Sequence, residues 1–101
     1  MIEQNIALPV DAIVEFCERY HIRKLALFGS VLGDDFRHDS DVDVLVEFES
    51  GHAPGWEFVS MQDELSEILG RPVDLNTPGF LSRHFRQRVI DNAQVIYERA
   101  G

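Results

Sequence analysis

The chain has 101 residues, of which 45% are hydrophobic, and its formal net charge at pH 7 is −9. This length and composition predict a single small globular domain over residues 1–101 and exclude a disordered chain. The negative charge argues against direct binding of DNA or RNA, because nucleic-acid-binding proteins cluster Lys and Arg to neutralise phosphates.

The location of the protein is predicted from what the chain lacks. No stretch approaches the roughly 18–20 apolar residues that span a bilayer. The N-terminal residues 1–5 lack the basic start of a signal peptide. We therefore expect a cytoplasmic protein that does not bind membranes.

Cysteine and histidine residues give no sign of a metal centre. The single cysteine, Cys17, has helical spacing with Ile13 and Phe16, which favours a buried structural thiol. The four histidines have no Cys or His companion at ligand spacing, so the sequence does not predict a zinc site. They are His21, His38, His52 and His84.

The first half of the chain predicts a helix, a strand, a short helix and a second strand. A helical stripe over residues 9–20 is opened by Pro9, and a short buried strand covers residues 24–28. A brief helix then runs from Gly29 to about Gly33. In the strand that begins near residue 41, Val side chains alternate with Asp41 and Asp43, which predicts one core face and one carboxylate face. Leu45 interrupts the polar face and is expected to cover part of the sheet.

The second half predicts two more helices and two more strands. A helix over residues 56–69 is stopped by Gly70, and a third short strand covers residues 73–75. Thr77 and Pro78 suit the start of a last helix over residues 79–92, followed by an edge strand over 94–98. The predicted fold is α/β (α+β), a small mixed sheet with helices packed on one face.

The most informative motif is a Gly29-Ser30 step followed by Asp41-x-Asp43. Asp41 and Asp43 are two apart in a strand, so both carboxylates point to the same face, where they offer the oxygen ligands that Mg²⁺ prefers. Gly29 lets the backbone approach a phosphate closely, and Ser30 adds a hydroxyl group. The motif therefore predicts a metal site beside a phosphate site.

Flanked by the apolar runs at 25–28 and 44–48, this motif resembles the DNA polymerase beta superfamily of nucleotidyltransferases, most of all its minimal nucleotidyltransferase branch. The likeness covers nearly the whole chain and includes Arg37-x-x-Ser40-Asp41-x-Asp43 and the segment at 70–75. The resemblance implies a nucleotidyltransferase fold, two Mg²⁺ ions and ATP as the substrate.

A third carboxylate is expected from Asp74. Val73 and Leu75 should face the core, which sends Asp74 to the face that carries Asp41 and Asp43. The resemblance implies that this third carboxylate completes a catalytic, metal-binding triad and acts as, or orients, the general base. The alternative is an exposed Asp at a strand end.

The resemblance also implies nucleotide-binding roles for Gly29, Ser30, Arg37 and Ser40. Arg37 would neutralise triphosphate charge, although an ordinary solvated Arg is equally consistent with the sequence, and Ser40 also suits a turn. Many relatives carry an Arg at position 33 and a Gly at 34, where this chain has Gly33 and Asp34. That departure makes the phosphate side of the site less positive.

Arginine and aromatic residues supply weaker candidates. Arg83, Arg86 and Arg88 form a basic cluster, with Arg83 and Arg86 expected on one helix face, where they would meet a phosphate, an acidic partner or only solvent. Three aromatic residues near loop ends are expected in the core, with stacking on an adenine base as the alternative. They are Trp56, Phe58 and Phe80.

The resemblance implies transfer of AMP from ATP to a hydroxyl group of a partner protein. In the family this partner is commonly a HEPN-domain toxin, and the minimal nucleotidyltransferase acts as its antitoxin, alone or in a homo- or hetero-oligomer. Two alternatives remain: an antitoxin that neutralises its partner by binding alone, and a nucleotidyltransferase subunit that acts on a small molecule. A basic partner would suit the net charge of −9.

Overall fold

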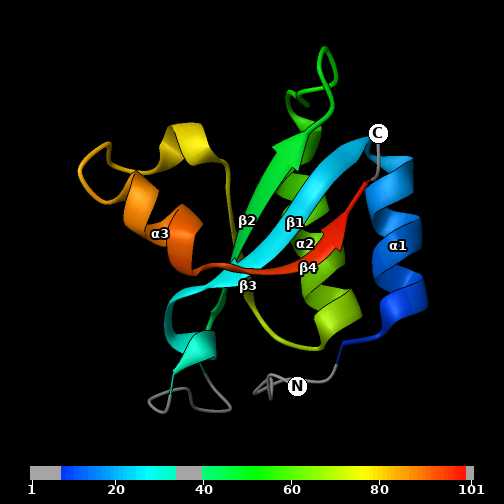
Figure 1. Ribbon diagram of the computed structural model, residues 1–101. Helices are drawn as coiled ribbons and strands as arrows, with labels where there is room; N and C mark the ends of the chain where they lie inside the picture. Colours follow the sequence, from blue (N-terminus) through cyan, green and yellow to red (C-terminus); the bar gives the residue numbers. More distant parts are fainter. Residues whose placement is uncertain (1–7, 34–39, 100–101) are drawn as a thin grey trace.

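The computed structural model describes residues 8–33 and 40–99 and shows a four-stranded sheet with helices packed against it (Figure 1). The elements follow in the order α1 (Val10–Arg19), β1 (Ile22–Phe28), the 3-10 helix η1 (Gly29–Leu32), β2 (Val42–Phe48), α2 (Glu57–Leu69), β3 (Val73–Asn76), the 3-10 helix η2 (Pro78–Phe80), α3 (Arg86–Asn92) and β4 (Gln94–Glu98). Every predicted strand is present, including the one at the C-terminal end of the described chain.

The sheet is mixed, in the order β3-β2-β1-β4. β1 pairs antiparallel with β2 and β4, whereas β2 pairs parallel with β3 through a crossover that contains α2. Parallel strands start at the same end of a sheet, so the first residues of β2 and β3 lie side by side. This arrangement confirms the predicted α/β class.

The main core lies on one face of the sheet, beneath α1 and α2. Alternate strand residues point into it, among them Leu25 and Leu27 of β1 and Val42 and Val44 of β2. The alternation is the one that the sequence predicts for half-buried strands. In the part of the chain that the structure describes, no helix combines the length and apolar character needed to cross a bilayer.

A second, smaller core lies on the opposite face. Ala26 and Leu45 are buried there with Leu81, and Val89 and Ile90 of α3 pack against them. The expectation of helices on one face therefore holds for α1 and α2, whereas α3 lies on the other face. The reason is that Ala26 and Leu45 form an apolar area on an otherwise polar face, and α3 removes it from water. Leu45 covers part of the sheet, as expected.

The C-terminal helix is much shorter than the predicted span of 79–92. η2 and a turn come first, and α3 begins only at Arg86. The Ser82 carbonyl accepts hydrogen bonds from the Phe85 and Arg86 amides, at 3.1 and 2.9 Å, and the Ser82 hydroxyl accepts one from the His84 amide at 3.3 Å. Such local side-chain bonds compete with helix formation, which explains the late start.

The helix α2 has the expected extent but a different aromatic arrangement. It begins at Glu57, and Gly70 closes it in the left-handed conformation with φ 70°. Trp56 precedes the helix and is 97% exposed, so its expected place in the core is wrong. Phe58 is partly buried and packs against the main core. The side chain of Phe80 lies outside the described residues.

Candidate active site

Two carboxylates meet where β2 and β3 begin. The parallel register places Asp43 of β2 directly beside Asp74 of β3, with Val42 beside Val73. Because Val42 and Val73 are buried in the main core, strand alternation sends both aspartates to the opposite face. Asp41, two residues before Asp43, is exposed at the same end of β2. The structure thus brings the three predicted carboxylates together.

Gly29 lies directly against this group. It follows β1, whose last residue, Phe28, pairs with Asp43 in the antiparallel register. Gly29 has φ 78°, and a β-carbon added to it would lie 3.1 Å from the Asp43 Cγ and overlap the Asp43 Oδ2 atom. Only glycine combines this backbone conformation with the close approach of a carboxylate. The Gly29 backbone is therefore one wall of the site.

The electrostatics of the site centre on Asp43. Burial raises the pKa of the Asp43 carboxyl above its ordinary value, and the neighbouring Asp74 and Asp41 carboxylates raise it further. Three carboxylates this close repel one another when all are ionised, and a bound cation relieves the repulsion. The donor set consists of carboxylate oxygens alone, which are the ligands of Mg²⁺ and other hard cations. The residues therefore fit a magnesium site.

The predicted phosphate-binding residues lie beside the carboxylates or outside the described chain. Ser30 is exposed in η1, where its carbonyl accepts the Gly33 amide at 3.0 Å and the next residue, Val31, is anchored in the core. Ser40 is half-buried directly before Asp41. Arg37 and Asp34 lie outside the described residues.

The basic cluster is not arranged as expected. Arg83 lies in the turn before α3, whereas Arg86 starts the helix, so the two do not share a helix face. Arg86 is half-buried, and its Nη2 atom donates a hydrogen bond to the Leu81 carbonyl at 3.1 Å. This contact ties α3 to the preceding turn, which gives Arg86 a structural role in the described chain.

A second group of polar side chains was not expected from the sequence. His21, Glu49 and His52 come together at the opposite end of β1 and β2 from Asp43. No spacing in the sequence pointed to them, because each follows a different helix or strand or lies in a loop. Their proximity depends on the antiparallel pairing of β1 with β2.

Fold and carboxylate group agree with the family comparison. The model of the family described as "Polymerase beta, Nucleotidyltransferase" matches residues 11–100. The chain belongs to this family. It is a nucleotidyltransferase, and relatives with similar sequences are named protein adenylyltransferases.

One such relative is the protein adenylyltransferase MntA of Thermococcus cleftensis, which is 33% identical over 84 residues, 82% of this chain and 81% of the relative. A solved structure described as a minimal nucleotidyltransferase is 31% identical, with a TM-score of 0.68, and the match covers 83% of this chain and 85% of that one.

Two more distant structures share the fold. A toxin–antitoxin structure with AMP-PNP matches with a TM-score of 0.71 and 19% identity, over 91% of this chain and 75% of the other. A tri-AMPylated HEPN toxin of Shewanella oneidensis in complex with an MNT antitoxin matches with a TM-score of 0.59 and 18% identity, over 89% and 70%. At these identities the likeness concerns the fold.

Proposed function

We propose that this chain is a Mg²⁺-dependent protein adenylyltransferase that transfers AMP from ATP to a hydroxyl group of a HEPN-type toxin and thereby acts as its antitoxin. The observation that carries the proposal is the pairing of Asp43 with Asp74 beside the Gly29 backbone. A site with adjacent carboxylates and room for a phosphate beside them suits transfer of a nucleotide.

Each carboxylate has a distinct proposed task. Asp41 and Asp43 hold Mg²⁺, which supplies positive charge that stabilises the phosphate oxygens during the transfer. Asp74, on the neighbouring strand and exposed, is accessible to an acceptor from outside. Gly29 and Ser30 hold the phosphates from the end of β1, and Ser40 positions the start of β2. Arg37 is proposed to neutralise triphosphate charge.

The reaction is a displacement at the α-phosphorus of ATP. The acceptor oxygen forms a bond to this phosphorus while the bond to the pyrophosphate oxygen breaks, so AMP is transferred and pyrophosphate leaves. Asp74 accepts the proton of the acceptor hydroxyl or orients it for removal. Most of the rate enhancement comes from positioning and electrostatic stabilisation, as in phosphoryl transfer generally.

The proposed acceptor is supported by relatives rather than by a surface of this chain. MntA of Thermococcus cleftensis is named a protein adenylyltransferase, and one structure with the same fold contains an AMPylated HEPN toxin with its MNT antitoxin. The net charge of −9 favours association with a basic partner through complementary charge.

The test is incubation of the chain with a co-expressed HEPN-type partner, ATP and Mg²⁺, followed by mass measurement of the partner. We expect a mass gain of one or more AMP groups, which disappears with Asp43→Asn or with EDTA. Asp63→Asn is the matched control, because Asp63 is an exposed carboxylate on α2. It should leave the transfer unchanged.

The outcomes separate this proposal from its alternatives. An unmodified partner whose toxicity is nevertheless suppressed by the wild-type chain would replace it with neutralisation by binding. A partner that stays unmodified while a small molecule gains AMP would replace the protein acceptor with a small-molecule acceptor.

A further inference from the structure

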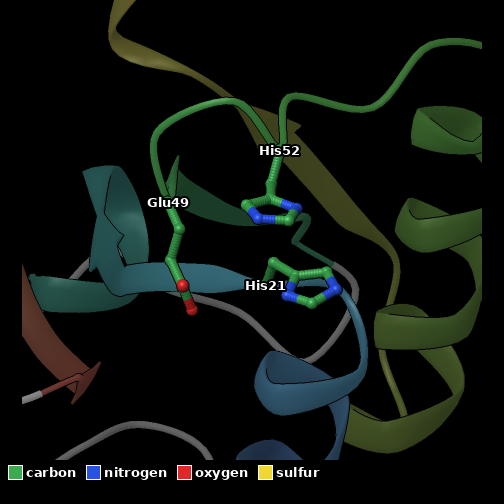
Figure 2. A group of neighbouring side chains, drawn as sticks. All are labelled: His21, Glu49 and His52. Atoms are coloured by element: carbon green, nitrogen blue, oxygen red, sulfur yellow. The ribbon is translucent and has the colours of Figure 1, made fainter.

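His21, Glu49 and His52 form a cluster at the end of the β1–β2 pair that lies away from Asp43 (Figure 2). His21 immediately precedes β1, Glu49 immediately follows β2, and His52 lies in the loop that leads to α2. Each offers one ligand atom, and these atoms lie within 4.8 Å of one another. Two imidazoles and one carboxylate are therefore in position to share a single ion.

Backbone hydrogen bonds hold the three residues together. The Glu49 amide donates to the His21 carbonyl at 2.9 Å, and the His52 amide donates to the Glu49 carbonyl at 3.0 Å. The cluster is thus built on fixed backbone positions and does not depend on the placement of long flexible side chains. A site with its ligands already positioned binds an ion with less loss of conformational entropy.

The backbone at His21 is unusual. Its φ is 56°, and it is the single non-glycine residue with positive φ in the described chain. This left-handed conformation costs a residue with a β-carbon about 1–2 kcal/mol, and glycine would avoid the cost. Strain of this kind is typical of functional positions. An imidazole at this site is consistent with a role for the side chain.

The side chains are supported and accessible. The Arg99 Nη1 atom donates to the Glu49 Oε2 atom at 3.1 Å, which orients the carboxylate in the way that outer-shell partners orient metal ligands. The His21 and His52 rings stack with centroids 4.1 Å apart and planes at 19°. Both rings are exposed and border a cleft of ≈ 520 Å³, so an ion and a water molecule have access to the cluster.

We propose that His21, Glu49 and His52 bind one Zn²⁺ ion, with water in the fourth position. Imidazole nitrogen together with carboxylate oxygen is a zinc donor set, whereas Mg²⁺ prefers oxygen alone. Ligand atoms around a tetrahedral zinc lie about 3.3 Å apart for bonds of about 2.0–2.1 Å. Rotation of the two exposed rings about their side-chain bonds closes the remaining gap.

The ion would connect the start of β1 to the loop after β2. This loop, residues 49–55, leads directly into α2 and the exposed Trp56. A bound ion would fix the loop against the sheet and raise the stability of the folded chain, because it binds only where the three ligands meet. This zinc site lies at the far end of the sheet from the carboxylate group.

The test uses the full chain, Zn²⁺ alone as the probe, and calorimetric titration with native mass spectrometry, without ATP or partner. We expect one tightly bound Zn²⁺ per chain and a higher melting temperature with zinc than with the same concentration of Mg²⁺. His52→Ala should weaken the tight site more than about tenfold. His84→Ala is the matched control, since His84 is an exposed histidine outside the cluster, and should bind as the wild type does.

Two more variants separate the loss of a zinc ligand from a disturbed fold and from zinc binding at the carboxylate group. His21→Asn removes the imidazole but keeps a residue type that tolerates positive φ, so the fold is preserved while zinc affinity falls. Asp43→Asn removes a carboxylate at the other site and should leave the tight zinc site intact. Unchanged zinc affinity in both histidine variants, or loss of the tight site in Asp43→Asn, would overturn the proposal. Because neither result depends on nucleotide transfer, the outcome is independent of the proposed function.

Discussion

Asp43 and Asp74 are register partners in the parallel pairing of β2 with β3, and both lie on the sheet face opposite the main core. Each residue alone would be an ordinary aspartate near a strand end. Side by side, with Asp41 close enough to influence Asp43, they concentrate negative charge in one place. This pairing also sets the stability cost of the site, from which the first prediction follows.

Replacing Asp43 should stabilise the metal-free chain while abolishing adenylyl transfer. The pKa of Asp43 is raised above its ordinary value of 3.8, so ionising it is less favourable in the folded chain than in the unfolded chain. The penalty is absent well below pH 3.8 and grows as the pH rises through the raised folded pKa. In EDTA at neutral pH, Asp43→Asn should therefore melt a few degrees above the wild type.

The measurement is thermal unfolding of both proteins in EDTA across a series of pH values. The difference in melting temperature should widen from acidic to neutral pH. Asp63→Asn, on α2, is the control for removing an exposed carboxylate. A wild type that is more stable than Asp43→Asn at neutral pH in EDTA would contradict the electrostatic account.

Gly29→Ala should abolish transfer by displacing Asp43. The new β-carbon would overlap the Asp43 Oδ2 atom, and the φ of 78° adds strain. Gly70→Ala is a matched control, because Gly70 has φ 70° but has no neighbouring atom within 4 Å of the added β-carbon. Both variants should lose about 1–2 kcal/mol of stability from the left-handed backbone.

Only Gly29→Ala should lose transfer activity and weaken Mg²⁺ binding, measured by partner mass and by calorimetry. Equal transfer activity in the two glycine variants would show that the approach of Gly29 to Asp43 has no bearing on catalysis.

Glu64 should stabilise the contact between α1 and α2 at neutral pH but not in acid. The Tyr20 hydroxyl donates to the Glu64 Oε1 atom at 2.7 Å, and Arg19 pairs with the other carboxylate oxygen. The Tyr20 hydrogen bond, followed by Arg19, holds the pKa of Glu64 below its ordinary value of 4.5. This stabilisation is present above pH 4.5 and is lost as the pH falls through the lowered folded pKa.

Glu64→Gln should thus lower the free energy of unfolding at pH 7 by up to about 1 kcal/mol, the usual range for an exposed ion pair. Denaturant unfolding at several pH values measures the loss, with Glu67→Gln as the control for an exposed glutamate on the same helix. The loss should shrink below pH 4.5; an equal loss at all pH values would rule out the ionised carboxylate as its source.

Cys17 should be unreactive in the folded chain. It is fully buried, and burial, followed by the neighbouring Glu18, raises the pKa of the Cys17 thiol to about 12. Alkylation requires an accessible thiolate, so labelling with iodoacetamide at pH 8 should be on the order of 100-fold slower in buffer than in urea. Mass spectrometry follows the reaction, and rapid labelling of the native chain would show that α1 opens readily.

Local patterns explain why much of the fold is predictable. The alternation of Val42 and Val44 with Asp41 and Asp43 predicts both the strand and the face that carries carboxylates. The same reasoning for Val73 and Leu75 predicts the direction of Asp74, and the structure agrees at each position. Periodicity is local, so it is readable without knowledge of the partner strand.

The last helix shows where local patterns fail. Thr77 and Pro78 suit a helix start, yet α3 begins at Arg86 and packs on the face opposite α1 and α2. Its position depends on the apolar area that Ala26 and Leu45 form together from two strands. A pattern within one segment does not contain that area.

The sequence by itself determined the α/β class, the resemblance to nucleotidyltransferases and the direction of each strand side chain, because these depend on neighbours along the chain. Only the tertiary structure decided that Asp43 stands beside Asp74, that Gly29 closes against Asp43, and that His21 meets His52. These contacts join segments far apart in sequence, and their register is set by hydrogen bonds between strands and by packing of the two cores. Long-range pairing brings the charged residues into groups that can hold ions.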